Sequence, residues 1–319
     1  MAWLLTETDV ERVLTMELAL EAVEEAFREQ AEGRAINEPR RRLRVPRGTL
    51  HLMSAAVLAR GVLGFKAYTS FPGGTRFLVL LYDAETGSLM ALIEADRLGQ
   101  MRTGAASGVA TRYMARPDAR TLGIFGTGWQ ARSQVQAICA VRPIRRVLAY
   151  SRTRERREAF CREMTAALGI DVRPAERPEA VVADADILVT ATTAREPVFD
   201  GRWVPEGVHI NAIGGNALLR REFDEEVIRR ARAIVVDSKD QARLECGEFL
   251  HAIERGRLAW DAVQELKDVV AGRYVARTQP ADITLFKSLG IALEDVAVAV
   301  RVFERAREEG LGQPVRLWE

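Results

Sequence analysis

Three small residues in one short stretch have the types and the spacing that dinucleotide binding requires. Gly126, Gly128 and Ala131 form the pattern G-x-G-x-x-A, between the apolar run 122–125 and a helical pattern over 130–140. In such a turn the first glycine permits a tight bend, the second lets the backbone approach a pyrophosphate, and the small third residue lets the helix pack on its strand. The helix N-terminus offers N–H groups to the phosphates. The stretch therefore predicts a dinucleotide site with contacts from Gly126, Thr127, Gly128, Trp129 and Gln130.

The end of the next predicted strand selects between the two nicotinamide cofactors. An acid at this position binds the ribose hydroxyls of NAD, whereas an arginine accommodates the 2′-phosphate of NADP. Here the run 146–150 is followed by Ser151, Arg152 and Thr153, with no acid before Glu155. A guanidinium and two hydroxyls suit a phosphate, although Arg152 also fits the start of a solvated helix. We therefore expect NADP(H) to be preferred, with NAD(H) as the alternative.

Small and polar residues follow two later strands, where parallel sheets bind their ligands. Paired glycines at such a strand end indicate backbone that passes beside a flat ring, or an ordinary loop. We expect the nicotinamide here, with Asn216 directed towards it. The candidate residues at these two strand ends are Thr190, Thr192, Ile213, Gly214 and Asn216.

Cations occur within otherwise apolar elements of the N-terminal half. Lys66 lies in an apolar strand, where an ammonium is unfavourable unless it is paired. Arg102 lies in a helix of small residues, and Arg44 in an earlier strand. Two arginines and a lysine suit a carboxylate, because Arg binds it in a bidentate fashion and Lys as a point charge. Each residue alone is also compatible with a structural ion pair. His51 is a candidate proton carrier or a structural histidine.

Composition excludes several functional classes. The chain has 319 residues and a net charge of +1, which does not indicate a nucleic-acid or membrane surface. Its three cysteines are scattered and only three histidines accompany them, so neither a disulfide framework nor a metal site is predicted. No apolar run approaches the ~20 residues of a membrane span, and the N-terminus does not resemble a signal peptide. We expect a cytoplasmic protein.

The elements that must position these residues fall into two groups. Before residue 117 the pattern is a helix over 16–33, a series of strands and a helix over 95–113 that is rich in small residues. Because the strands follow one another without helical crossovers, they predict a separate and mostly antiparallel sheet. The strands are predicted at 42–46, 49–57, 61–68, 76–82 and 89–94.

After residue 117 strands alternate with helices, which predicts a doubly wound parallel sheet of the Rossmann type. Its strands are predicted at 122–125, 146–150, 187–190, 208–213 and, last, 233–236. A final helix over 282–309 is expected to leave this sheet and return to the first domain. The fold class is therefore α/β: residues 117–295 form the dinucleotide-binding domain, and residues 1–116 with about 296–319 form an α+β domain for substrate binding and dimerisation.

Taken together, these motifs resemble the ornithine cyclodeaminase/mu-crystallin family over nearly the full length. The family includes ornithine cyclodeaminases, alanine dehydrogenases and reductases of cyclic ketimines. The resemblance implies a homodimer built through the N-terminal domain and an active site in the cleft between the domains. The stretches that carry it are GFKAYTSFP (64–72), RTGAASGVATRYMAR (102–116), LGIFGTGWQA (122–131), ADILVTATT (185–193), INAIGGN (210–216) and DITLFKSLGIALEDVAVA (282–299).

The resemblance also implies residue roles. Arg44, Lys66 and Arg102 match the positions that hold the substrate carboxylate, and Thr103 matches a phosphate contact. Ser151, Arg152 and Thr153 resemble the NADP-preferring members, and Ser288 is a further candidate cofactor contact. Catalytic roles are expected for Lys66, Asn216 and His51.

Two departures from the cyclodeaminase pattern bear on the reaction. Asn216 stands where those enzymes have an aspartate, and His51 stands where a second acid helps to bind the distal amino group of ornithine. The sequence therefore favours an NAD(P)H-dependent reductase of an α-imino acid, such as pyrroline-2-carboxylate or another ketimine, or the reverse amino-acid dehydrogenase. An ornithine cyclodeaminase, which forms proline and ammonia, is the first alternative. A binding protein that holds NADP and a small ligand without turnover is the second.

Overall fold

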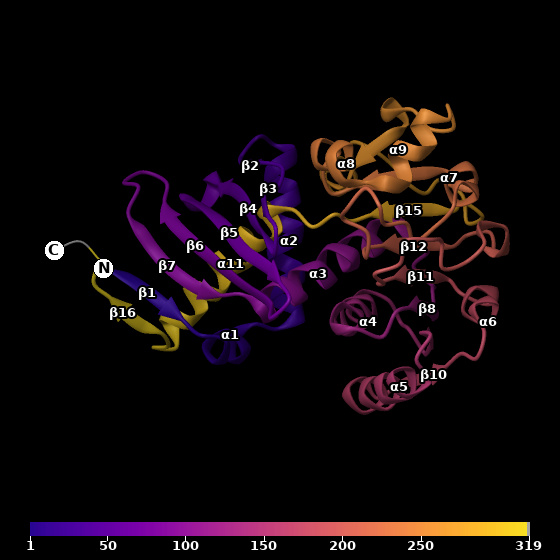
Figure 1. Cartoon of the computed structure of the whole chain (residues 1–319), viewed down its shortest axis with the longest axis horizontal. Helices are drawn as coiled ribbons and strands as arrows, with labels where there is room; N and C mark the ends of the chain where they lie inside the picture. The colour runs from indigo at the N-terminus through magenta and orange to yellow at the C-terminus, as the bar shows by residue number, and fades with distance from the viewer. Residues whose placement is uncertain (318–319) are drawn as a thin grey trace. The chain divides into compact units, whose positions relative to one another are not determined.

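The computed structural model describes residues 1–317, which form two compact units (Figure 1). The mixed-sheet unit comprises Met1–Ala105 and the segment that begins at Ile291, and the parallel-sheet unit comprises Ala106–Gly290. The sequence places the first boundary at 116/117, after the helix of small residues. In the structure it falls inside that helix, α3 (Asp96–Met114).

The mixed-sheet unit contains an eight-stranded sheet in the order β16-β1-β7-β6-β5-β4-β2, with β3 paired to β4. Neighbouring strands are antiparallel except β1, which runs parallel to β7. The five predicted strands are confirmed, whereas β2 and the terminal strands β1 and β16 were not predicted because all three are short. The strands are β1 (Ala2–Leu5), β2 (Ala35–Asn37), β3 (Arg41–Val45), β4 (Gly48–Val57), β5 (Val62–Phe71), β6 (Gly74–Asp83), β7 (Leu89–Glu94) and β16 (Gln313–Val315).

One face of this sheet is covered by α11 (Ala292–Glu308), which also packs against α2 (Met16–Ala31). Gly64 allows this close packing: a Cβ there would lie 2.5 Å from the Leu80 carbonyl oxygen and 3.4 Å from Val296. Thr6 caps α1 (Glu7–Val13), and Thr15 caps α2 through its hydroxyl. In this way the sheet and α11 bury the strand residues that alternate towards the helix.

The parallel-sheet unit has strand order β10-β9-β8-β11-β12-β15-β13-β14, and every pair is parallel. The chain moves outwards in opposite directions from β8 and β11, so the order reverses between these two strands. This doubly wound arrangement confirms the predicted fold. The strands are β8 (Thr121–Phe125), β9 (Arg146–Tyr150), β10 (Asp171–Pro174), β11 (Ile187–Thr190), β12 (His209–Ala212), β13 (Ala233–Val236), β14 (Val263–Glu265) and β15 (Thr284–Lys287).

The prediction of one helix over 282–309 is wrong at its start. Residues 284–287 form β15, a fully buried strand between β12 and β13. A short apolar run can form a buried strand or a helical turn, and periodicity alone does not separate the two. Gly290 then adopts φ 71°, a left-handed conformation, before α11 begins at Ala292. The predicted last strand, β13, is therefore followed by two more.

Helices cover both faces of the parallel sheet. In Figure 1, α4 and α5 lie on one face and α6 on the other. Ala131 and Phe160 pack on the first face with Ile124 and Val147, and Val181 packs on the second face with Phe125. The helices of this unit after α3 are α4 (Trp129–Val141), α5 (Arg154–Leu168), α6 (Pro178–Ala183), α7 (Glu225–Arg230), α8 (Lys239–Glu245), α9 (Gly247–Glu254) and α10 (Leu266–Val270).

Candidate active site

The glycine turn lies between β8 and α4, at the strand-order reversal. Gly126 has φ 100°, and a Cβ there would come within 2.3 Å of the Ala191 carbonyl oxygen, so both its conformation and its packing require glycine. Gly128 is the N-cap of α4, faces open space and leaves the helix without a side-chain cap. Ala131 is fully buried. Open space beside uncapped N–H groups fits a dinucleotide pyrophosphate.

The remaining residues of this turn lie at its edge. Trp129 is the first residue of α4 and is 54% exposed. Gln130 is half-buried, and its carbonyl oxygen accepts a hydrogen bond from Ser133. The Thr127 hydroxyl donates to the Ser151 hydroxyl at 3.1 Å, which links the glycine turn to the end of β9.

Hydroxyls and one arginine follow β9. The Ser151 hydroxyl donates to the Thr153 carbonyl oxygen, and the Ser151 carbonyl oxygen accepts from buried Arg157. Arg152 is exposed and forms no ion pair within residues 1–317. This end of β9 therefore has the exposed Arg152 guanidinium in sequence between two residues with hydroxyls, Ser151 and Thr153.

A buried glutamate that sequence reasoning missed joins the loops after β11 and β12. Glu222 is fully buried, and its carboxylate accepts four hydrogen bonds of 2.6–2.9 Å. They come from the Thr190 hydroxyl, from the backbone and the hydroxyl of Thr192, and from the Gly214 backbone. A Cβ on Gly214 would lie 2.1 Å from the Thr192 carbonyl oxygen. Gly214 is therefore required by packing between the two loops.

A second buried ionic group lies beside the glycine pair. Lys287, at the end of β15, is fully buried, and its Nζ is 3.8 Å from Glu248 Oε1. Glu248 also accepts a hydrogen bond from the Glu222 backbone at 3.1 Å. A Cβ on Gly215 would lie 3.2 Å from both charged groups, so the loop that carries Asn216 rests directly on them.

Predicted cofactor contacts Ile213 and Ser288 are likewise held by neighbouring strands. The Ile213 backbone donates to the Thr190 carbonyl oxygen at 2.9 Å. The Ser288 hydroxyl donates to Asp237, which follows β13 and also accepts from the backbones of Leu289 and Gly290. Burial raises the pKa of Asp237, although these hydrogen bonds oppose the shift. Both residues therefore lie at the carboxyl edge of the parallel sheet.

In the mixed-sheet unit, the structure brings two of the three predicted cations together. Lys66 Nζ donates to Asp295 at 2.9 Å, and Arg102 donates to Asp295 at 2.9 Å and to Glu294 at 2.7 Å. All four side chains are at most 8% exposed. The two acids, on α11, were not predicted as part of the site because they lie about 190 or more residues away from Arg102 in sequence.

Burial and neighbouring charges act differently on these cations. Burial lowers the pKa of Lys66 to about 8; Asp295 opposes this shift, whereas Arg102 and Arg40 reinforce it. Burial alone would lower the pKa of Arg102, but Asp295 and Glu294 raise it above its usual value. Lys66 therefore remains protonated at neutral pH, and Arg102 is always charged.

The third predicted cation, Arg44, lies further along the sheet and is exposed. Arg40, which the sequence analysis did not select, is nearer to Lys66. It is 5% exposed, and its Nε lies 3.3 Å from Met53 Sδ, in the residue paired with Lys66 across β4 and β5. Arg40 is one of four arginines within five residues, and nothing in the sequence distinguishes it from the other three. Its burial in the fold is what identifies it.

His51 and Thr103 complete the predicted residues of this unit. The His51 ring stacks on Tyr68 with 4.1 Å between centroids, and its Nε2 is 3.2 Å from the Ser70 hydroxyl. Burial, together with Arg42, Arg40 and Arg44, lowers its pKa to about 4. The Thr103 hydroxyl donates to the Gly99 carbonyl oxygen within α3.

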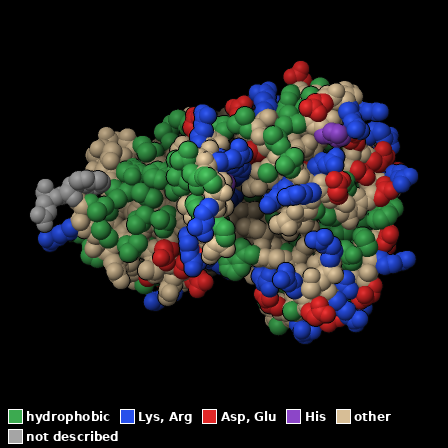
Figure 2. Space-filling model, in the orientation of Figure 1, with side chains coloured by type: hydrophobic (Ala, Val, Ile, Leu, Met, Phe, Trp, Pro, Cys, Tyr) green, Lys and Arg blue, Asp and Glu red, His purple; other side chains and the backbone are tan. Residues whose placement is uncertain are grey.

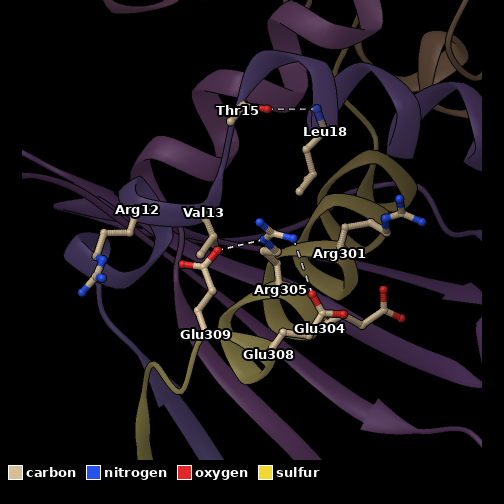
Figure 3. Close-up of a pocket in the computed structure, with 9 residues that line it drawn as sticks. All are labelled: Arg12, Val13, Thr15, Leu18, Arg301, Glu304, Arg305, Glu308 and Glu309. Atoms are coloured by element: carbon tan, nitrogen blue, oxygen red, sulfur yellow. Dashed lines mark hydrogen bonds and ion pairs between the residues drawn. The ribbon is translucent and has the colours of Figure 1, made fainter.

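A surface cavity of about 490 Å³ lies away from these residues, among α1, α2 and α11 (Figure 3). Its charged side chains pair with one another: Arg305 bonds Glu309 at 2.8 Å and lies 3.6 Å from Glu308. None of the predicted site residues lines this cavity.

In residues 1–317, no set of three or more His, Cys, Asp or Glu side chains is placed to hold a metal ion. None of the helices described for the chain combines the length and apolar character needed to cross a bilayer.

The chain is similar to known proteins over nearly its whole length. A sequence model of the ornithine cyclodeaminase/mu-crystallin family matches residues 2–310. A Thermococcus litoralis Δ1-pyrroline-2-carboxylate reductase, solved with NADH and L-proline, is 37% identical with a TM-score of 0.93, over 98% of this chain and 100% of that one. An archaeal alanine dehydrogenase dimer with bound NAD is 35% identical with a TM-score of 0.93, over 99% of both chains.

A third structure widens the range of substrates among the relatives. The iminosuccinate reductase of Paracoccus denitrificans, solved with NAD⁺, is 30% identical with a TM-score of 0.93, over 99% of both chains. These relatives confirm the predicted class of activity, a nicotinamide-dependent oxidoreductase of imino or amino acids, and the predicted fold.

Proposed function

Because this chain belongs to the ornithine cyclodeaminase/mu-crystallin family, we propose that it reduces an α-imino acid to the amino acid, or catalyses the reverse oxidation. The observation that carries this proposal is the buried cluster of Lys66 and Arg102 on Asp295 and Glu294. Lys66 has three N–H donors and Arg102 five, so both retain donors for a substrate carboxylate while the acids fix their positions. Arg40 adds a third buried cation beside them.

In this proposal the chain contributes binding, orientation and charge, since hydride transfer is the chemistry that a nicotinamide supplies when bound. The cations hold the α-carboxylate and fix the imine carbon in one position. Lys66, protonated at neutral pH, also favours electron flow towards the substrate nitrogen. Asn216 cannot act as a base at neutral pH, so its proposed role is to orient the imine N–H or a water molecule.

The proposed cofactor is NADP(H) in preference to NAD(H). The support is Arg152, exposed and without an ion pair in the described chain, between the hydroxyls of Ser151 and Thr153. The relatives solved with a cofactor carry NAD(H), which is the alternative for this chain. Arg152→Ala should raise the KM for NADPH roughly tenfold, as for loss of one charged hydrogen bond, and leave that for NADH unchanged. Equal changes for both cofactors would reject the assignment.

The proposed assembly is a homodimer formed through the sheet of the mixed-sheet unit. The face opposite Lys66 exposes apolar side chains on neighbouring strands, and Figure 2 shows hydrophobic side chains gathered over this unit. Exposed apolar surface of this kind marks interfaces. Leu52→Asp should give a monomer by light scattering, whereas an unchanged mass would contradict the interface. The exposed residues of this face are Leu43, Val45, Leu52, Leu63, Phe71 and Leu78.

An ornithine cyclodeaminase is the alternative, and the surroundings of His51 oppose it. A distal ammonium would meet Arg42, Arg40 and Arg44 rather than an acid. The test follows NADPH and NADH oxidation with pyrroline-2-carboxylate, in parallel with ammonia release from L-ornithine. Oxidation without ammonia release supports the reductase. Ammonia release would establish the cyclodeaminase, and cofactor binding with no turnover across a panel of imino acids would establish a binding protein.

The proposed compartment is the cytoplasm.

A further inference from the structure

One face of the mixed sheet carries a row of cations that continues beyond the cluster at Lys66. Across β3, β4 and β5 the register pairs Arg42 with His51 and Tyr68, and Arg44 with Thr49 and Ser70. Paired residues project on the same side of a sheet, as do residues two apart on one strand. His51 and Arg42 therefore lie one step, about 6.7 Å, from the Lys66 pair, and Arg44 lies one step further.

The polar groups of this row have capacity for a ligand. His51 is 8% exposed, and its Nδ1 is buried without a hydrogen-bond partner in residues 1–317. Its Nε2 already faces the Ser70 hydroxyl, so the neutral ring can accept there and donate through Nδ1. A buried nitrogen without a partner is unfavourable, and a ligand oxygen at this point would satisfy it. Arg44 is exposed and makes no ion pair in the described chain.

The charges on this row have one sign. Arg40, Arg42 and Arg44 all act electrostatically on His51, and no acid is among the groups that do so. Asp295 and Glu294 lie at the other end, where they compensate Lys66 and Arg102. A distal ammonium would be repelled here, and a plain hydrocarbon side chain would leave Arg44 and the His51 Nδ1 without a partner in the described chain. A second anionic group fits.

We infer that the substrate is an α-imino dicarboxylate, with its α-carboxylate on Lys66, Arg102 and Arg40 and its distal carboxylate on His51 and Arg44. This inference rests on the proposed function and specifies its substrate class. In the reaction, the imine carbon receives a hydride from NAD(P)H and the nitrogen ends with one additional proton. The products are the amino dicarboxylate and NAD(P)⁺, so the cofactor is oxidised as the C=N bond is reduced.

The experiment compares imines that differ in the distal group. Imines form in solution when a 2-oxo acid meets ammonium, so oxaloacetate and 2-oxoglutarate are the dicarboxylate probes and pyruvate is the monocarboxylate probe. Pyrroline-2-carboxylate is the cyclic probe. NADPH and NADH oxidation is recorded with and without ammonium, and the amino-acid product is identified by chromatography, which separates imine from ketone reduction. We expect kcat/KM for a dicarboxylate probe at least tenfold above pyruvate and pyrroline-2-carboxylate.

Two failures are distinguishable. Reduction of pyruvate imine or pyrroline-2-carboxylate with equal or higher kcat/KM than both dicarboxylates would overturn this inference and leave the proposed function in place. No ammonium-dependent or pyrroline-dependent oxidation with any probe would overturn both.

Variants of one strand and the turn that follows it provide the matched test. Arg44→Ala should lower kcat/KM for the dicarboxylate about tenfold, as for loss of one charged hydrogen bond, mainly through KM, and Arg44→Glu should lower it further. Arg47→Ala is the control, because Arg47 is also exposed but lies in the turn between β3 and β4, outside the row of cations and outside the proposed dimer face. Both arginines are at the surface, so folding is not at risk. Equal effects of Arg47→Ala and Arg44→Ala would reject the distal site.

Discussion

Two lysines are buried to a similar depth, one in each unit, but their surroundings differ. Lys66 is 2% exposed and Lys287 is fully buried. Lys66 donates to Asp295 at 2.9 Å, yet burial lowers its pKa to about 8, and two nearby arginines reinforce the shift. Lys287 lies 3.8 Å from Glu248 and has no hydrogen-bond partner in the described residues. Burial alone would lower its pKa, but Glu248 and the other acids around it raise it.

The difference indicates two uses of a buried ammonium. At Lys66 the neighbouring arginines Arg102 and Arg40 add positive charge, and Lys66 makes one hydrogen bond to an acid, so in our proposal the cluster binds a further anion. At Lys287 the surrounding charge is acidic, and the lysine compensates Glu248 beneath the loop that carries Asn216. Burial is common to both lysines, and the sign of the neighbouring charges separates a binding cation from a supporting one.

Lys66→Met should have the largest effect on catalysis. Loss of a buried charge that holds the substrate carboxylate should lower kcat/KM on the order of a hundredfold, which corresponds to a loss of about 3 kcal/mol of transition-state stabilisation. Steady-state kinetics with the best imino-acid substrate measures it, and circular dichroism checks folding. Lys267→Met, which alters a partly exposed lysine paired with Glu265, is the control and should be nearly silent. A Lys66→Met enzyme with normal kcat/KM would remove the proposed carboxylate site.

Lys287→Met should instead act on stability. It leaves the Glu248 carboxylate buried without its cation, which should lower the free energy of unfolding by about 3 kcal/mol. Calorimetry measures the effect. Adding Glu248→Gln to the same chain should recover part of the loss, because the uncompensated charge is then gone. If Lys287→Met left stability unchanged and mainly raised the substrate KM, the contrast between the two lysines would be wrong.

Glu222→Gln should weaken the loops after β11 and β12. An amide NH₂ cannot accept the hydrogen bonds that one carboxylate oxygen accepts from Thr190 and Gly214, or the other from Thr192. We expect the cofactor KM to rise roughly thirtyfold, which corresponds to a loss of about 2 kcal/mol of binding free energy. Glu196→Gln, at a glutamate whose side chain is 78% exposed and paired with Arg221, is the control. Identical cofactor KM values for the two variants would reject this role of Glu222.

Near neutral pH the smallest expected effect is the pH dependence of substrate capture, which grows only above pH 8. The profile of kcat/KM reports groups of the free enzyme, and Lys66 is charged below its pKa of about 8. The plot of kcat/KM should therefore be level below pH 8 and fall about tenfold per pH unit above it. Lys287 should not contribute to this limb, because its pKa is raised. A level profile up to pH 10 would show that the charge of Lys66 is not used.

The local sequence pattern was sufficient to predict most of the longer strands and helices, and the glycine turn that is expected to bind the cofactor. The alternation of strands and helices, the G-x-G-x-x-A spacing and the small residues of α3 all express local requirements of backbone and packing, so the sequence alone indicated them. β15 was misread as part of a helix, because a run of four apolar residues is too short to show its period. The short strands β1, β2, β10, β14 and β16 were not predicted.

Long-range pairing could not be determined in that way. Asp295 meets Lys66 across 229 positions of sequence, and Glu222 meets Thr190 across 32. The sequence around either acid looks the same as the sequence around an acid exposed to solvent. The partner of each acid depends instead on which strands and helices lie side by side in the fold. Likewise, four arginines between residues 40 and 44 look alike in sequence, and the two-residue repeat of β3 together with burial separates Arg40, Arg42 and Arg44 from Arg41. Sequence determined the chemistry available to this protein, and tertiary structure decided which charges meet.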